Sequence, residues 1–205
     1  IQKLENDLEL VRKHRARYRN RRRQEGMPVL SLVGYTNAGK STLLNALSKA
    51  GVIAEDKLFS TLDPITRRIA LPDGGNALLT DTVGFIQKLP TALIASFRAT
   101  LEELQESDLI LQVIDITHPN AAEHSQVVEG ILEELNIETK PRILVLNKVD
   151  LLVTDETKMS ELLLNDFKSS DHPIVMVSSI RKMGLDQLLS MIESALSQQK
   201  TQVHM

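Results

Sequence analysis

The chain contains no cysteine and no tryptophan, and aromatic residues make up only 3% of its 205 residues. The absence of cysteine excludes disulfide bonds, cysteine nucleophiles and cysteine-ligated zinc, and it fits a reducing compartment. No run of eighteen apolar residues occurs, so no transmembrane helix is expected. The histidines are scattered, and none pairs with another at the short spacing of a metal site. The composition is otherwise ordinary for a globular protein, with 42% hydrophobic and 25% charged residues.

The formal net charge of −3 conceals an uneven distribution. Residues 1–26 hold nine Lys/Arg and four Asp/Glu, a net charge of +5, so the remainder carries −8. Eight of the basic residues fall within residues 12–23. Such a cluster should attract a phosphate backbone, which favours binding to nucleic acid. A membrane surface and a solvated helix face are the alternatives.

The same N-terminal segment has the apolar spacing of a helix. Ile1, Leu4, Leu8 and Val11 form one narrow stripe, which is too thin to make a core by itself. The chain begins with Ile1 rather than Met, so we expect a fragment or a processed product whose missing neighbour covers the stripe. We divide the chain into a basic helical linker (1–26), a nucleotide-binding domain (27–200) and a C-terminal tail (201–205).

After a break at 26–28, apolar strands alternate with helical segments. Strands are expected at 29–33, 109–115, 142–146 and 174–177, a hairpin at 67–71 and 77–80, and helices at 39–50, 90–105, after Asn120, and 185–197. Asn120 and Glu123 predict an N-cap with a reciprocal partner. This alternation predicts an α/β fold with a mostly parallel sheet covered on both faces.

Residues 34–41 read GYTNAGKS and match the phosphate-binding loop pattern G-x-x-x-x-G-K-[ST]. The loop lies between a predicted strand and a predicted helix, as the motif requires. Its glycines let the backbone N–H groups and the helix N-terminus approach a phosphate closely. Lys40 would reach the β- and γ-phosphates, and Ser41 would offer its hydroxyl to Mg²⁺.

Residues 147–150 read NKVD and select the base. They follow the apolar strand 142–146, about 110 residues after the phosphate loop, at the edge of the sheet where α/β folds bind ligands. The Asp150 carboxylate can accept hydrogen bonds from N1–H and N2–H₂ of guanine, a donor pair that adenine lacks. Asn147 would tie this loop to the phosphate loop, and the Lys148 stem would cover the base. The motif therefore predicts a guanine nucleotide.

Three weaker elements complete the pattern. Residues 81–84 read DTVG; Asp81 would hold Mg²⁺ through a water molecule, and the Gly84 N–H would contact the γ-phosphate. Residues 178–180 would contact guanine through backbone groups. Thr61 is the candidate second hydroxyl ligand of Mg²⁺, and it would order its loop only when the γ-phosphate is present.

Together these motifs resemble the translation-factor class of GTPases and, more narrowly, the HflX family in the Obg–HflX group. The resemblance covers residues 10–195 and is carried by the segments GYTNAGKSTL (34–43), LFSTLDP (58–64), DTVGFIQKLP (81–90) and SFRATLEE (96–103). It implies a Ras-like P-loop GTPase, a three-layer sandwich with a mostly parallel six-stranded sheet, preceded by an α-helical linker and a further domain absent here.

The resemblance also implies a GTPase that binds the large ribosomal subunit and ribosomal RNA, and that splits or rescues stalled ribosomes or assists subunit assembly. Its catalytic residues would be Lys40, Thr61 and Gly84, and its metal ligands Ser41, Thr61 and Asp81. The nucleotide-binding residues would be Gly34, Tyr35, Thr36, Asn37, Ala38, Gly39, Lys40, Ser41, Thr42, Phe59, Ser60, Thr61, Leu62, Asp63, Asp81, Thr82, Val83, Gly84, Asn147, Lys148, Val149, Asp150, Ser178, Ser179 and Ile180.

One position departs from many small GTPases. Phe85 stands directly after the DTVG glycine, where those proteins place a water-orienting glutamine. This predicts slow intrinsic turnover stimulated by a partner, with K⁺ seated by Asn37 as a second source of help. A GTP-licensed binding switch with negligible catalysis is the alternative function. A Ras-type membrane GTPase is disfavoured, because the chain has no C-terminal cysteine to prenylate. We expect a monomer in the bacterial cytoplasm or an organelle matrix.

Overall fold

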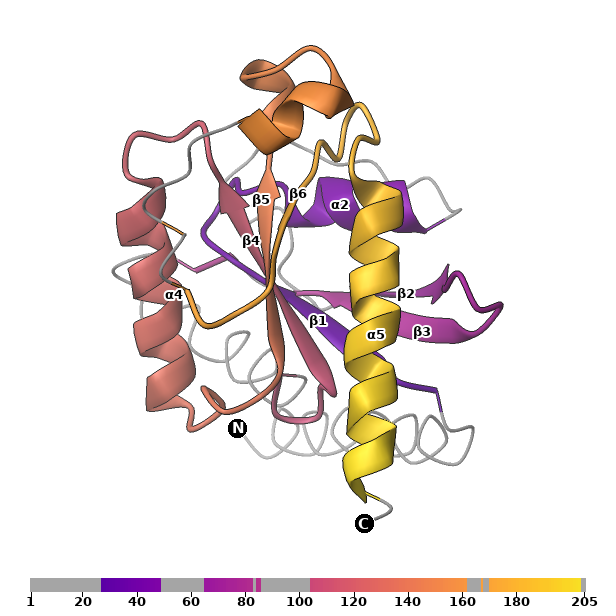
Figure 1. Cartoon of the computed structure of the whole chain (residues 1–205). Coiled ribbons are helices and arrows are strands. Elements are labelled where there is room, and N and C mark those ends of the chain that lie inside the picture. The colour runs from indigo at the N-terminus through magenta and orange to yellow at the C-terminus, as the bar shows by residue number, and fades with distance from the viewer. Residues whose placement is uncertain are drawn as a thin grey trace, which may run out of the picture.

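A computed structural model describes residues 27–48, 65–82, 84–85, 104–161, 167 and 170–203. Its centre is a six-stranded sheet in the order β2-β3-β1-β4-β5-β6 (Figure 1). The strands are β1 (Val29–Val33), β2 (Ile65–Ala70), β3 (Asn76–Asp81), β4 (Leu109–Asp115), β5 (Arg142–Asn147) and β6 (Ile174–Met176). All neighbouring strands pair in parallel except β2 and β3, which form the predicted hairpin. The predicted fold class is confirmed.

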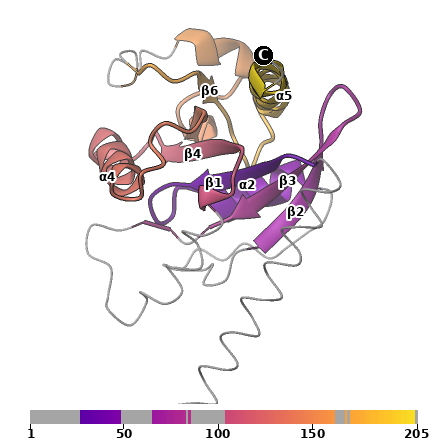
Figure 2. The same cartoon turned by 90° about the horizontal axis from the view of Figure 1, so that it is seen from below.

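Helices cover both faces of this sheet. They are α2 (Lys40–Leu47), α4 (Ala121–Glu134) and α5 (Leu185–Val203), with the short 3-10 helices η2 (Val149–Leu151) and η3 (Glu156–Glu161). Seen from below, α4 lies on one side of the sheet and α5 on the other (Figure 2). Among the described helices, none combines the length and hydropathy that a membrane span needs.

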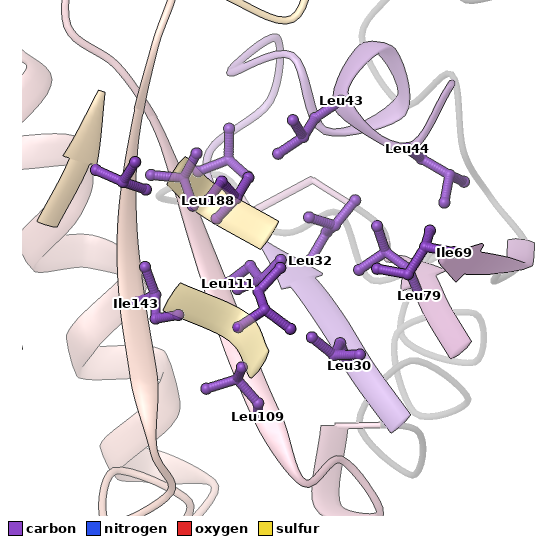
Figure 3. Packing of buried hydrophobic residues seen from close by; sticks show 14 of the residues in the cluster. Leu30, Leu32, Leu43, Leu44, Ile69, Leu79, Leu109, Leu111, Ile143 and Leu188 are labelled. Atoms are coloured by element: carbon purple, nitrogen blue, oxygen red, sulfur yellow. The ribbon is translucent and has the colours of Figure 1, made fainter. Parts of the chain in front are cut away.

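Alternation of side chains along the strands divides the core between the two faces. Leu30 and Leu32 of β1 pack with Leu43 and Leu44 of α2 and with Leu188 of α5 (Figure 3). The other face buries a second cluster, made by Val33, Phe85, Leu104, Ile110, Val128, Leu132 and Ile137. The central strands are therefore apolar on both faces, which explains their nearly continuous hydrophobic sequences.

Two local predictions differ from the structure. The side chain of Asn120 donates to Glu123 Oε2 at 3.2 Å instead of capping the backbone of α4, so the reciprocal partner is present but the predicted N-cap bond is not. The last helix continues to Val203, well past residue 197, because residues 198–203 contain no glycine or proline to end it. Of the helix predicted at 90–105, residues 90–103 lie outside the described ranges.

Candidate nucleotide-binding site

Parallel pairing brings the ends of four strands to one edge of the sheet. The phosphate loop follows β1, while β3, β4 and β5 end at Asp81, Asp115 and Asn147. In the order β2-β3-β1-β4, the connection after β1 leads to strands on one side of it, and the connection after β3 leads to β4 on the other side. Such a switch point is where open α/β sheets bind ligands. The two strongest motifs of the sequence therefore meet at one place.

The backbone of the phosphate loop requires glycine at two positions. Gly39 has φ +94, and a Cβ there would fall on Nδ2 of Asn147. A Cβ on Gly34 would meet the carbonyl oxygen of Val113. Between them, Ala38 N donates to Tyr35 O at 3.3 Å and Asn37 adopts φ +62, which closes a tight turn. The loop is thus held in a folded path by its own backbone.

Lys40 is the buried cation of this loop. Its side chain is 7% exposed, and its ammonium donates to the carbonyl oxygens of Gly34 and Tyr35, each at 3.1 Å. Burial lowers the pKa of Lys40 to about 8, opposed by the charge of Asp81. A cation held in a desolvated place by neutral carbonyls is stabilised further by an anion. The geometry therefore favours a phosphate group here.

Ser41 and Asp81 present a pair of oxygens beside Lys40. The Ser41 hydroxyl donates to Asp81 Oδ2 at 2.6 Å, and Asp81 is completely buried. In the described part of the chain, no three His, Cys, Asp or Glu residues gather as a metal site. Mg²⁺ commonly takes only one or two oxygen ligands from the protein and the rest from phosphates and water. The Ser41–Asp81 pair fits that ion.

The segment after β3 lies against the phosphate loop. A Cβ on Gly84 would be 3.2 Å from Lys40 Nζ and 2.8 Å from Thr36 Cγ2, so Gly84 reaches the phosphate-binding end of the loop. Phe85 accepts a hydrogen bond from Thr36 N at 3.0 Å and donates one to Gly34 O at 3.1 Å. Its side chain is completely buried in the cluster beneath α4. Phe85 therefore anchors this segment and has no polar group to orient water.

Asn147 joins the guanine motif to two other loops. It is 2% exposed, and its amide donates to Ala38 O of the phosphate loop at 2.9 Å. Its Oδ1 accepts from the N–H and the hydroxyl of Ser179, at 3.1 and 2.9 Å. The predicted tie between the base loop and the phosphate loop is therefore present, and Ser179 of the fifth element belongs to the same network.

Lys148 and Asp150 flank the predicted place of the base. Lys148 has φ +69, and its ammonium forms an ion pair with Asp115 Oδ2 at 2.7 Å. Burial raises the pKa of Asp115, but hydrogen bonds from Lys148 and Thr117 lower it by more, so the pKa lies below its ordinary value. Asp150 is half-buried and makes no hydrogen bond or ion pair with any other residue described. Its carboxylate is available to a ligand.

Asp115 was missed by the sequence reasoning. It ends the predicted strand 109–115 at the same edge as Asn147, and a carboxylate at that position was a usable signal.

The backbone of residues 178–180 follows β6, and the Ser178 hydroxyl accepts from Arg181 N at 2.9 Å. Ile180 is 75% exposed. The structure therefore places the fifth element at the predicted edge.

Several predicted residues lie outside the described ranges. These are Phe59, Ser60, Thr61, Leu62, Asp63 and Val83, together with the basic segment 1–26. The remaining predicted site residues come from four segments that gather at one sheet edge, namely 34–42, 81–84, 147–150 and 178–180. Their roles toward a nucleotide stay predictions.

The fold and this edge define a protein of the Ras-like P-loop GTPase class. Residues 29–148 match the family described as 50S ribosome-binding GTPase. GTPase HflX of Caldanaerobacter subterraneus subsp. tengcongensis is 47% identical over 196 residues, covering 96% of this chain and 43% of that protein. GTPase HflX of Escherichia coli K12 is 41% identical over 198 residues, covering 96% of this chain and 45% of that protein.

Solved structures of another GTPase, Era, are similar to this chain in fold. A point variant of Era from Aquifex aeolicus, bound to GDP.AlF4⁻, has a TM-score of 0.66 at 26% identity, over 81% of this chain and 56% of that one. A structure of Era with MgGDPNP and nucleotides 1506–1542 of 16S ribosomal RNA has a TM-score of 0.60 at 27% identity, with the same coverage of both chains. The chain belongs to the 50S ribosome-binding GTPase family and, within it, to the HflX GTPases. It spans less than half the length of these HflX relatives.

Proposed function

We propose that the chain binds GTP at this edge, hydrolyses it to GDP and phosphate, and acts as a nucleotide-dependent switch on the large ribosomal subunit. The observation that carries the proposal is the convergence of a buried lysine, a metal-type oxygen pair and a guanine motif. Asn147 joins the last of these to the phosphate loop through Ala38 O. A glycine-rich turn with a purely structural role would not need Lys40 buried beside Asp81.

Phosphoryl transfer to water depends on positioning and charge neutralisation more than on covalent chemistry. Lys40 would direct its remaining N–H toward phosphate oxygens, and the N–H groups at the start of α2 would face the same anion. Ser41 and Asp81 would hold Mg²⁺, which neutralises charge on the β- and γ-phosphates when bound. Gly84 would donate its N–H to the γ-phosphate, and Thr61 would add a second hydroxyl.

Phe85 accounts for the proposed slow intrinsic turnover. Because the ring is buried under α4, the residue in the glutamine position cannot hold the attacking water. A partner must therefore supply or position the missing group, and the large ribosomal subunit is the simplest candidate. If no partner accelerates turnover, the alternative function holds, in which GTP only licenses binding.

K⁺ is a second proposed source of help. Asn37 is exposed on the phosphate loop at φ +62, where its carbonyl side chain is free to turn toward a monovalent ion beside the phosphates. GTP turnover in KCl and in NaCl at equal ionic strength tests this directly. Faster turnover in KCl supports the cation, and equal rates remove it.

The ribosomal part of the proposal rests on the family and on charge. The matched family is described as 50S ribosome-binding, and an Era structure contains 16S ribosomal RNA. In this chain, the eight basic residues within 12–23 would contact ribosomal RNA. The protein would act as a monomer in the bacterial cytoplasm or an organelle matrix, splitting or rescuing stalled ribosomes or assisting subunit assembly.

The test measures GTP turnover and ribosome binding with purified large subunits at several salt concentrations. We expect stimulated turnover and salt-sensitive binding, with binding weakened when Arg21, Arg22 and Arg23 are replaced by alanine. A control replaces the exposed arginines Arg68 and Arg181, which lie outside the basic segment. Binding without stimulation would leave only the binding switch. Unchanged binding by the triple variant would refute the role of the basic segment.

A further inference from the structure

An aromatic stack joins the phosphate loop to a helix that carries none of the nucleotide motifs. The Tyr35 ring lies on the His124 imidazole of α4 with centroids 3.7 Å apart and planes inclined by 4°. His118, in the turn before α4, places its own ring 4.3 Å from that of His124. Both Tyr35 and His124 are half-buried. Burial, followed by the charge of His118, lowers the pKa of His124, which favours the neutral imidazole in the stack.

The backbone of Tyr35 holds Lys40, the cation that would face a phosphate, and closes the turn of the loop. Its carbonyl oxygen accepts from Lys40 Nζ at 3.1 Å and from Ala38 N at 3.3 Å. Its peptide neighbour, Thr36 N, donates to Phe85 O at 3.0 Å. The Lys40 ammonium has three N–H donors and gives two of them to the carbonyls of Gly34 and Tyr35, so it can add a phosphate oxygen while these bonds hold the turn. The position of Tyr35 therefore helps to fix both Lys40 and the first turn of the loop.

Helix α4 supports Tyr35 through two of its residues. His124 contacts Tyr35, and Val128, four residues further on, lies in the buried cluster that holds Phe85. Tyr35 and Phe85 are themselves paired as an isolated β-bridge. A cavity of about 240 Å³ adjoins the stack and is lined by Tyr35, Thr36, Asn37 and His118 among others. Loss of the imidazole would enlarge this space and free the tyrosine ring to enter it.

We infer that His124 is a positioning residue for nucleotide binding, acting by fixing Tyr35 and with it the first turn of the phosphate loop. The inference rests on the proposed function, because it assumes that this loop binds the phosphates of a guanine nucleotide. A loop already held in its binding path loses less conformational freedom when the ligand arrives. His124 should therefore set the affinity for the nucleotide and leave the turnover of the saturated protein nearly unchanged.

The experiment compares GDP affinity and GTP turnover in the wild-type chain and in His124→Ala, His124→Phe, Tyr35→Ala and the double variant. His172→Ala is the matched control, because His172 is also a half-buried histidine but precedes β6 at the opposite edge of the sheet. Aromatic pairs of this kind correspond to roughly 2- to 12-fold in an equilibrium constant. We expect His124→Ala to weaken GDP binding by about that factor and to raise KM with kcat within about twofold.

His124→Phe keeps a flat ring on Tyr35 and should restore most of the affinity. The double alanine variant should bind no worse than the weaker single variant, since both changes remove one interaction. Wild-type affinity in His124→Ala, failure of His124→Phe to rescue, or an equal loss in His172→Ala would each overturn the inference. A wild-type chain that binds no guanine nucleotide would instead refute the proposed function, so the two failures are distinguishable.

Discussion

The side-chain amide of Asn147 lies 2.9 Å from the carbonyl oxygen of Ala38, 109 residues earlier in the chain. The same side chain accepts two hydrogen bonds from Ser179. One buried asparagine thus joins the phosphate loop, the guanine motif and the fifth element. A nucleotide that contacts all three loops would find them already arranged, which reduces the entropy lost on binding.

Asn147→Ala should destabilise the chain and weaken nucleotide binding together. It leaves Ala38 O and two donor groups of Ser179 without their partner in a buried place. We expect a loss of about 2 to 4 kcal/mol in the free energy of unfolding, measured in urea. GDP affinity should fall by at least about tenfold, which corresponds to 1.4 kcal/mol. Asn76→Ala, at an exposed position in the hairpin, is the control. A variant with wild-type stability and affinity would show that the link is incidental.

Two glycines should respond in opposite directions to alanine. Gly39 has φ +94, and its added methyl group would fall on the amide of Asn147, so Gly39→Ala should lower stability and abolish GDP binding. Gly130 lies within α4 and has nothing within 4 Å of an added Cβ. Gly130→Ala should therefore stabilise the chain by about 0.5 to 1 kcal/mol. Thermal unfolding and GDP titration of both variants are the measurements, and similar behaviour of the two would contradict the structure.

The pKa of Lys40 predicts two pH dependences of opposite sign. Folding lowers this pKa from its ordinary value of 10.5 to about 8, so between these values the unfolded chain holds the proton more tightly. The stability of the nucleotide-free chain should therefore rise with pH across this window, by about 3 kcal/mol in total. Lys40→Met should lose that rise. A rise of equal size in both proteins would assign it to other groups.

Nucleotide affinity should change the other way. Phosphate binds the charged ammonium, so GDP affinity should be flat below pH 8 and fall toward a tenfold loss per pH unit above it. Calorimetric titration in buffers of different ionisation heat would detect the proton taken up near pH 9. Affinity that stays constant to pH 10 would mean that Lys40 does not contact the phosphates.

The backbone path of the phosphate loop, the sheet edge and the hairpin could be predicted from the sequence, because residues close together in the chain determine them. Gly39 adopts φ +94, which glycine reaches without strain, and the alternation of apolar strands and helices determines which edge carries the loops. The hairpin at β2 and β3 followed from residues 72–76, which read PDGGN, a run of turn-forming residues between two apolar segments. Each of these features depends on residues that are close in the chain, or on the fixed spacing of residues within a motif.

Long-range side-chain pairs could not be derived in this way. Asp115 meets Lys148 only because β4 and β5 are adjacent, with Asp115 in register with Asn147. Tyr35 meets His124 only because α4 packs beside the phosphate loop. A single sequence specifies no such register or packing distance. Asp115 and His124, the members of these pairs that belong to no sequence motif, therefore emerge only from the structure.

The base specificity assigned to Asp150 tests the central claim most directly. Asp150 lies in η2, the short helix that follows β5 and Lys148, where its half-buried carboxylate would accept the N1–H and N2–H₂ of guanine. Asp150→Asn replaces one acceptor oxygen by a donor, which matches the additional carbonyl oxygen of xanthine. Equilibrium titration with GDP, XDP and ADP should show wild-type preference for GDP and a reversal toward XDP in the variant, by at least about 100-fold in the ratio of affinities. Retained preference for GDP in Asp150→Asn, or equal binding of ADP and GDP by the wild-type chain, would contradict a guanine nucleotide site at this edge.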